Sequence, residues 1–119
     1  MPVILVVEDH ADTLDLIAEM LRRMSYVVRA AVTAADALDS VRQQRPDAIL
    51  LDIKLPDASG TIALDELRKL RPTVPIIMLT ANTDAVLARN TLKHGAFDYI
   101  MKPFDAERLK SVVEAALAS

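Results

Sequence analysis

Apolar runs that alternate with helix-like segments constrain the fold of this chain more strongly than any other feature. Continuous apolar runs occur at Val3–Val7, Ala48–Leu51 and Ile76–Leu79. Runs of this length are typical of strands that are buried on both faces of a sheet. Two further strand-like runs, Tyr26–Ala30 and Asp98–Met101, bring the number of predicted strands to five.

Each predicted strand is followed by a segment whose apolar residues recur at the spacing of an amphipathic helix. The predicted helices run from about Asp12 to Met24, from Thr33 to Pro46, from Gly60 to Pro72, from Asp84 to His94, and onward from about Asp105. Thr33 and Asp36 match a capping box at the start of the second helix. Gly95 is expected to end the fourth helix in the left-handed conformation.

This alternation predicts an α/β protein with a flavodoxin-like (βα)5 three-layer sandwich around a five-stranded parallel sheet. The three fully apolar runs suit the centre of the sheet. Arg29 and Asp98 interrupt the second and fifth runs, which therefore suit its edges. The strand order 2-1-3-4-5 satisfies these preferences. Open sheets of this kind bind ligands beyond the carboxyl ends of their strands, at the switch point between strands 1 and 3.

Composition limits the classes of protein to which the chain can belong. With 119 residues, of which 52% are hydrophobic, residues 1–119 are expected to form one domain with a substantial core. The chain has no cysteine, and no apolar run approaches the roughly 20 residues that a membrane span needs. A net charge of −3 argues against direct binding of nucleic acid. The simplest expectation is a cytoplasmic domain without a membrane or nucleic-acid partner.

Polar and charged residues stand at the ends of four of the predicted strands. Glu8 and Asp9 follow the first strand, Asp52 the third, Thr80 the fourth and Lys102 the fifth. The carboxyl ends of parallel strands meet at one edge of the sheet, so we expect these five side chains to share one crevice.

The chemistry of these side chains indicates phosphoryl transfer. Three carboxylates in a partly dry crevice repel one another, which favours either protonation or a bound cation. Mg²⁺ typically combines a few carboxylates with water and phosphate oxygens. A carboxylate nucleophile, a divalent cation, an ammonium group and a hydroxyl can together stabilise a phosphoryl group on the attacking oxygen. The set therefore points to an aspartyl phosphate.

Four motifs make the chain similar, from end to end, to the response-regulator receiver domains of two-component signalling. They are Val6–Asp9, Leu51–Gly60, Leu79–Ala81 and Gly95–Phe104. Each motif alone is weak, but their order and spacing are specific. The resemblance implies the fold deduced above and a role in signal transduction.

The resemblance also implies a phosphoacceptor and a metal site. Asp52 would accept the phosphoryl group. Asp9 and Asp52 would bind Mg²⁺, or Mn²⁺, directly, while Glu8 would act largely through water. The main-chain carbonyl of Lys54 would be a further ligand. Lys54 and Asn82 also match the variable positions that tune hydrolysis of the phosphoaspartate in this family.

The remaining implied roles concern the phosphoryl oxygens and the response to them. Lys102 and Thr80 would hold the phosphoryl oxygens, and the Lys102–Pro103 peptide bond would be cis. Thr80 and Tyr99 would form a switch that changes the surface of the fourth helix, fifth strand and fifth helix. That surface would control an output domain, a partner or a homodimer.

The resulting hypothesis is a phosphorylation-dependent switch. A sensor histidine kinase or phosphotransfer protein would supply the phosphoryl group from a phosphohistidine. The protein would not be an enzyme beyond catalysing its own phosphorylation and dephosphorylation.

Two alternatives stay open at this stage. One is an interaction module that never carries phosphate. The other is a Mg²⁺-dependent small-molecule phosphatase or NTPase, which is disfavoured because neither GxxxxGK[ST] nor GxGxxG occurs. His10 and His94 are expected to be solvated and to bind no metal, and Asp57 is expected to be a turn residue.

Overall fold

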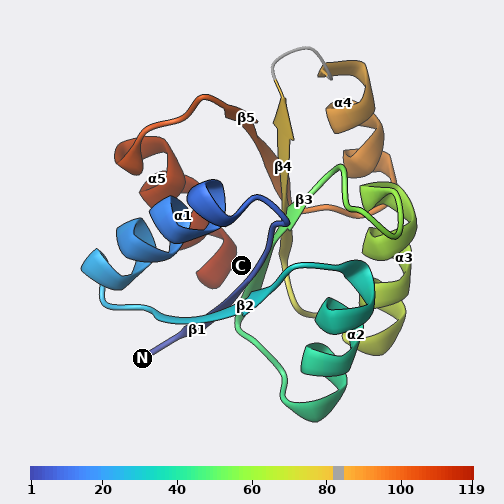
Figure 1. Ribbon diagram of the computed structural model, residues 1–119, viewed down its shortest axis with the longest axis horizontal. Helices are drawn as coiled ribbons and strands as arrows, with labels where there is room; N and C mark the ends of the chain where they lie inside the picture. The colour runs from blue at the N-terminus through green and yellow to red at the C-terminus, as the bar shows by residue number, and fades with distance from the viewer. Residues whose placement is uncertain (82–84) are drawn as a thin grey trace.

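The structure is a computed structural model that describes residues 1–81 and 85–119. Five strands form one parallel sheet in the order β2-β1-β3-β4-β5 (Figure 1), as predicted. The strands are β1 (Val3–Val7), β2 (Val27–Ala31), β3 (Ala48–Asp52), β4 (Ile76–Ala81) and β5 (Asp98–Lys102). The second strand begins one residue later than predicted, at Val27, and the fifth continues through Lys102.

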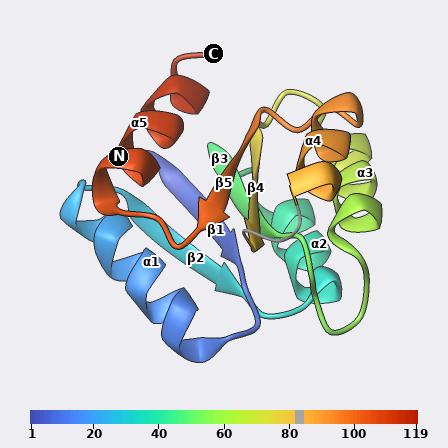
Figure 2. The same cartoon turned by 90° about the horizontal axis from the view of Figure 1, so that it is seen from above.

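Five helices cover the sheet. They are α1 (Ala11–Arg23), α2 (Ala34–Gln43), α3 (Gly60–Leu70), α4 (Ala85–Lys93) and α5 (Ala106–Leu117). Figure 2 shows α1 and α5 on one face of the sheet and α2, α3 and α4 on the other, which makes the predicted three-layer sandwich. The predicted start of the fourth helix at Asp84, and Asn82 before it, lie outside the described residues. None of the described helices has the length and apolarity that a membrane crossing requires.

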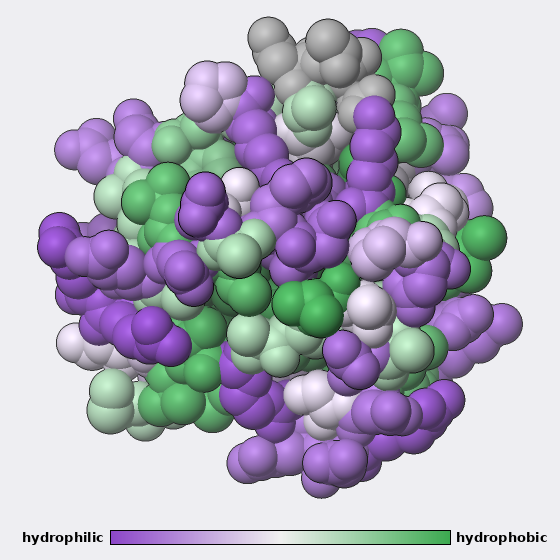
Figure 3. All heavy atoms as spheres, in the orientation of Figure 1, coloured by the Kyte–Doolittle hydropathy of each residue, from purple (hydrophilic) through white to green (hydrophobic). Residues whose placement is uncertain are grey.

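The alternation of side chains along the strands divides the core into two clusters. In β1, Ile4 and Val6 pack with residues of α1 and α5, while Leu5 and Val7 face α2 and α3. All four side chains are fully buried. Burial on both faces explains why the central strands are continuous apolar runs. On the face in Figure 3, hydrophobic side chains show at the surface between the hydrophilic ones.

Local signals fix several helix ends. The Thr33 hydroxyl accepts a hydrogen bond from the Asp36 N–H at 3.0 Å, which confirms the predicted N-cap of α2. Gly95 follows α4 with a φ of +97°, as expected for a left-handed C-terminal residue. The Lys102–Pro103 peptide bond is cis, again as predicted.

The loop between β3 and α3 folds back tightly on its own strand. The Gly60 N–H donates to the Ile53 carbonyl at 2.7 Å. A Cβ atom on Gly60 would lie 2.5 Å from the Ile53 Cα atom, so the turn admits only glycine without rearrangement. The loop that follows Asp52 is thereby held at the carboxyl edge of the sheet.

Candidate functional site

The carboxyl ends of β1, β3 and β5 bring three charged side chains together. The Lys102 Nζ atom lies 3.4 Å from both carboxylate oxygens of Glu8 and 3.4 Å from the Asp52 Oδ2 atom. Glu8 is fully buried, and only 5% of Asp52 is exposed. The prediction that these residues meet in one crevice is therefore confirmed for this trio.

The electrostatics of the trio are dominated by Glu8. The pKa of the Glu8 carboxyl is raised from 4.5 to about 7, chiefly by burial and next by the neighbouring Asp52 carboxylate, while Lys102 opposes the shift. A buried acid beside another acid holds its proton near neutral pH unless a cation offsets the negative charge. One ammonium group thus compensates two carboxylates only in part.

Asp9 and His10 extend the cluster beyond β1. The His10 Nδ1 atom lies 3.2 Å from the Glu8 Oε1 atom and 3.3 Å from the Asp9 Oδ1 atom. The Asp9 Oδ1 atom is shielded from solvent and accepts no hydrogen bond from the described residues. His10 is solvated as expected, with 73% of its side chain exposed. The sequence did not indicate that its Nδ1 atom lies among the donor atoms of Glu8, Asp9 and Asp52. His94 lies elsewhere, 3.4 Å from Asp65 on α3.

The loop after β3 orients Asp52. The Lys54 N–H donates to the Asp52 Oδ1 atom at 3.1 Å, which leaves the Oδ2 atom facing Lys102. Lys54 pairs across the loop with Ser59 in an isolated bridge. The hydrogen bond fixes the rotation of the carboxylate and aims one oxygen into the crevice.

Thr80 and Tyr99 lie on the neighbouring strands β4 and β5. Thr80 is fully buried, and its hydroxyl donates to the Ala81 carbonyl at 3.3 Å. Tyr99 is partly buried against the core cluster that faces α2 and α3. Its carbonyl accepts a hydrogen bond from Arg108 of α5 at 3.2 Å. The strand pairing places Tyr99 beside Met78, two residues before Thr80.

The loop residue Asp57 has a contact that its sequence position does not reveal. Its carboxylate accepts hydrogen bonds from the N–H groups of Ala34 at 2.8 Å and Ala35 at 3.1 Å. These bonds lower the pKa of the Asp57 carboxyl. Asp57 is a turn residue that also satisfies the first N–H groups of α2, which ties the β3–α3 loop to a distant helix.

The donor atoms of the acidic cluster suit a divalent cation. Glu8, Asp9, His10 and Asp52 each offer one atom, and these atoms lie within 4.8 Å of one another. Carboxylate oxygens predominate, as in sites for hard cations, and the Asp9 Oδ1 atom lacks any other partner among the described residues. The residues present therefore fit a Mg²⁺ or Mn²⁺ ion.

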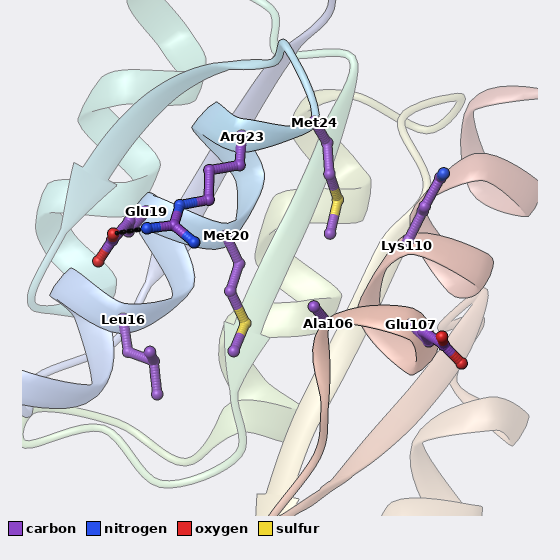
Figure 4. Close-up of a pocket in the computed structure, with 8 residues that line it drawn as sticks. All are labelled: Leu16, Glu19, Met20, Arg23, Met24, Ala106, Glu107 and Lys110. Carbon is purple, nitrogen blue, oxygen red and sulfur yellow. Dashed lines mark hydrogen bonds and ion pairs between the residues drawn. The ribbon is translucent and has the colours of Figure 1, made fainter.

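A second hollow lies between α1 and α5 and is separate from this cluster. Its volume is about 530 Å³, and Figure 4 shows Leu16 and Met20 of α1, with Met24 just after the helix, opposite Glu107 and Lys110 of α5. No residue of the acidic cluster is among the residues that line it. The groove is therefore not the site of the chemistry that the cluster supports.

Comparison with known families gives this geometry its context. A model described as the response regulator receiver domain matches residues 4–114. The chain belongs to this family. The family prediction, the order of the strands and the cluster at the carboxyl edge of the sheet thus agree.

Individual relatives show the same relationship. The transcriptional regulatory protein ZraR of Salmonella typhimurium is 37% identical over 115 residues, which cover 97% of this chain and 26% of that protein. The receiver domain of NtrX from Brucella abortus is 36% identical with a TM-score of 0.95, and the match covers 98% of both chains. The receiver domain of the sensor histidine kinase PA1611 from Pseudomonas aeruginosa has a TM-score of 0.91 and is 37% identical, and the match covers 99% of this chain and 98% of that one.

The matches cover only part of each curated relative, which limits what can be carried over from it. The chain spans about a quarter of the length of the curated relatives that it matches. It is similar to their receiver domains, and the activities of the whole regulators belong to longer proteins.

Proposed function

We propose that residues 1–119 form one receiver domain in which Asp52 accepts a phosphoryl group from a phosphohistidine. The donor is a sensor histidine kinase or a phosphotransfer protein, and the reaction requires Mg²⁺ or Mn²⁺. The observation that carries the proposal is the placement of Asp52, almost fully buried at the end of β3 and 3.4 Å from the Lys102 ammonium group. A nucleophilic carboxylate beside a fixed cation is suited to phosphoryl transfer.

The proposed step moves one phosphoryl group between two side chains. The Asp52 Oδ2 atom attacks phosphorus, an O–P bond forms and the N–P bond to the donor imidazole breaks. The donor imidazole nitrogen keeps the bonding electron pair. The donor ring leaves as neutral imidazole, after taking a proton from solvent where it did not already carry one. The Lys54 N–H holds the other Asp52 oxygen at 3.1 Å, so the attacking oxygen is pre-oriented.

Lys102 and Thr80 would bind the oxygens of the incoming group. The Lys102 ammonium already lies beside Asp52, and its charge would offset the charge on the phosphoryl oxygens. Thr80 would exchange its hydrogen bond to the Ala81 carbonyl for one to a phosphoryl oxygen. Both roles use groups that the fold places at the ends of β4 and β5.

Asp9, Asp52 and the Lys54 carbonyl would hold the divalent ion, with Glu8 acting largely through water. When bound, the ion supplies positive charge that offsets the phosphoryl oxygens and the three carboxylates. The buried, unpartnered Asp9 Oδ1 atom supports this assignment. The PA1611 receiver domain, which is similar in fold, has a magnesium ion coordinated in its active site cleft.

The proposed output is a change in the surface formed by α4, β5 and α5. Thr80 and Tyr99 would link that surface to the phosphoryl group and so control an output domain, a partner or a homodimer. The protein would then catalyse only its own phosphorylation and dephosphorylation, in the cytoplasm. Nucleic acid and membrane binding would lie outside this domain, whose net charge is −3.

The direct test is intact-mass spectrometry after incubation with acetyl phosphate and Mg²⁺. The wild-type protein should gain the mass of one phosphoryl group, and Asp52→Asn should gain none. Asp57→Asn is the control, because Asp57 lies on the same loop but its carboxylate faces α2. If Asp52→Asn gained the mass of a phosphoryl group, Asp52 would not be the acceptor.

The same assay separates the alternatives. A wild-type protein that never gains mass, with acetyl phosphate or with a phosphorylated kinase, would be an interaction module. Continuous release of phosphate from a free phosphomonoester would instead indicate a small-molecule phosphatase.

A further inference from the structure

We propose that His10 supplies an imidazole nitrogen to the metal site of this receiver domain, so that the site favours transition-metal ions over Mg²⁺ more than oxygen ligands alone would. The inference rests on the proposed function for its metal site. It adds a ligand and a metal preference to that site.

The spacing of the donor atoms carries the inference. The His10 Nδ1 atom is 3.2 Å from the Glu8 Oε1 atom and 3.3 Å from the Asp9 Oδ1 atom. In an octahedral site with bonds of about 2.0–2.2 Å, neighbouring ligand atoms lie roughly 3 Å apart. The nitrogen therefore already stands at the distance of an adjacent ligand from the Asp9 Oδ1 atom.

The partners of these atoms support a ligand at this point. The Asp9 Oδ1 atom is buried and accepts no hydrogen bond from the described residues, even though the His10 ring lies against it. The Lys102 ammonium approaches Glu8 and Asp52 at 3.4 Å, and no ion pair between it and Asp9 is found among the described residues. An ion between Asp9 and His10 would give this oxygen the partner that it lacks.

The position of His10 in the chain keeps the ring at the site. His10 is the N-cap residue of α1, and its extended backbone has φ −83° and ψ 114°. Its side chain makes no capping hydrogen bond to the helix. The ring is therefore not used to start α1, and its Nδ1 atom instead makes a hydrogen bond of 3.2 Å to the Glu8 Oε1 atom of the cluster.

The identity of the donor atom predicts the metal preference. Imidazole nitrogen suits Ni²⁺, and the affinity of a site rises from Mn²⁺ through Co²⁺ to Ni²⁺, whereas carboxylate, carbonyl and water oxygens suit Mg²⁺ and Mn²⁺. Removing a nitrogen ligand should weaken Ni²⁺ binding far more than Mg²⁺ binding. We expect the ratio of the Mg²⁺ to the Ni²⁺ dissociation constant to fall at least about tenfold in His10→Gln.

The experiment uses the full chain without a polyhistidine tag. Isothermal titration with Mg²⁺, Mn²⁺, Co²⁺ and Ni²⁺ compares wild type, His10→Gln and His94→Gln. His94→Gln is the matched control, because His94 is the other histidine of the chain and pairs with Asp65 on α3. Pulsed electron paramagnetic resonance of bound Mn²⁺ then reports directly on a coordinated nitrogen.

The inference predicts nitrogen coupling to Mn²⁺ in wild type and in His94→Gln, and its loss in His10→Gln. Bound Mn²⁺ without nitrogen coupling in wild type, with equal metal preference in all three proteins, would overturn the role of His10 and leave the proposed function intact. Absence of binding by any of the four ions would overturn both, because the metal site itself would be missing.

Discussion

At the scale of single residues, Glu8 is the side chain whose environment departs most from that of an ordinary surface acid. It is fully buried, and burial raises its pKa from 4.5 to about 7. A pKa that is higher in the folded than in the unfolded protein means that folding favours the protonated form. The stabilising effect of this proton is fully present below pH 4.5 and is lost as the pH rises through about 7.

We therefore predict that the metal-free protein loses stability between pH 4.5 and 7, because Glu8 must ionise in a buried site. The loss is at most about 3 kcal/mol for a shift of this size. Urea denaturation in the presence of a chelator should show the loss in wild type but a flatter profile in Glu8→Gln. Saturating Mg²⁺ should reduce the loss in wild type, since an ion that binds only the folded protein stabilises it. Parallel profiles for both proteins would contradict this account.

The site residues were predictable from the sequence where strand ends determine their positions. Asp52 ends the buried strand β3 and Lys102 ends the edge strand β5, so the topology alone brings them to the same edge of the sheet. His10 was not predictable in this way, because it lies in the turn after β1 and its ring direction depends on the turn. Asp57 is similar, since its contact with the start of α2 depends on how two loops pack.

At the scale of elements, the β3–α3 loop joins the acceptor strand to the rest of the molecule. Within this loop, the Asp57 carboxylate accepts a hydrogen bond from the first N–H group of α2. At the end of the loop, the Gly60 N–H donates to the Ile53 carbonyl. Helix α3 then begins with Ser59 as N-cap, whose hydroxyl accepts from the Ile62 N–H at 3.3 Å. These contacts hold the main chain that follows the acceptor, including the Lys54 N–H that orients Asp52.

We predict that Gly60→Ala destabilises the fold and disturbs phosphorylation. The added Cβ atom would lie 2.5 Å from the Ile53 Cα atom and 2.7 Å from its carbonyl oxygen, and neither main-chain atom can move freely. Overpacking of this kind costs about 1–3 kcal/mol, and sometimes more. Urea denaturation should show this loss, together with slower labelling by acetyl phosphate. Thr61→Ala, one residue later in α3, is the control and should change the free energy of unfolding little.

Element types and their order were predictable because the apolar runs and helical spacings are long and consistent. Strand boundaries moved by one or two residues, since β2 begins at Val27 and β4 continues from Leu79 to Ala81. Tyr26 is apolar enough to extend β2, yet pairing with β1 begins at Val27, opposite Val3. The pairing of β2 with β1 therefore determines where β2 begins, which the apolar pattern of the sequence alone does not.

At the scale of the whole molecule, the proposed function requires the acidic cluster to influence the surface formed by α4, β5 and α5. The C-terminal end of α4 is tied to α3, because Arg68 donates to the Gly95 carbonyl at 2.7 Å and His94 lies 3.4 Å from Asp65. Arg108 of α5 holds the Tyr99 carbonyl at 3.2 Å. The end of α4 is thus tied to α3, and α5 is tied to β5. The proposed connection from this surface to Asp52 runs through Thr80 and Tyr99 on the adjacent strands β4 and β5.

A phosphoryl oxygen that draws the Thr80 hydroxyl toward Asp52 would break its bond to the Ala81 carbonyl and vacate space beside β5. The Tyr99 ring could then turn inward. A shift in population from 1:99 to 99:1 needs about 5.5 kcal/mol, whereas one hydrogen bond contributes about 0.5–1.5 kcal/mol. Thr80 alone therefore cannot complete the switch. We expect Lys102 to contribute and the population shift to be partial.

We predict that Thr80→Ala still accepts a phosphoryl group on Asp52 but loses most of the response in α4 and β5. Thr80→Ser keeps the hydroxyl and should retain the response, which separates the hydrogen bond from the packing of the methyl group. The measurement is the amide NMR spectrum of the three proteins with and without beryllofluoride, a mimic of the phosphoryl group. Because the ligand shifts the equilibrium only by its different interaction with the two states, removing the hydroxyl must reduce the shift if this route carries the coupling. Equal chemical-shift changes over residues 85–99 in wild type and Thr80→Ala would show that the signal reaches the surface by another path.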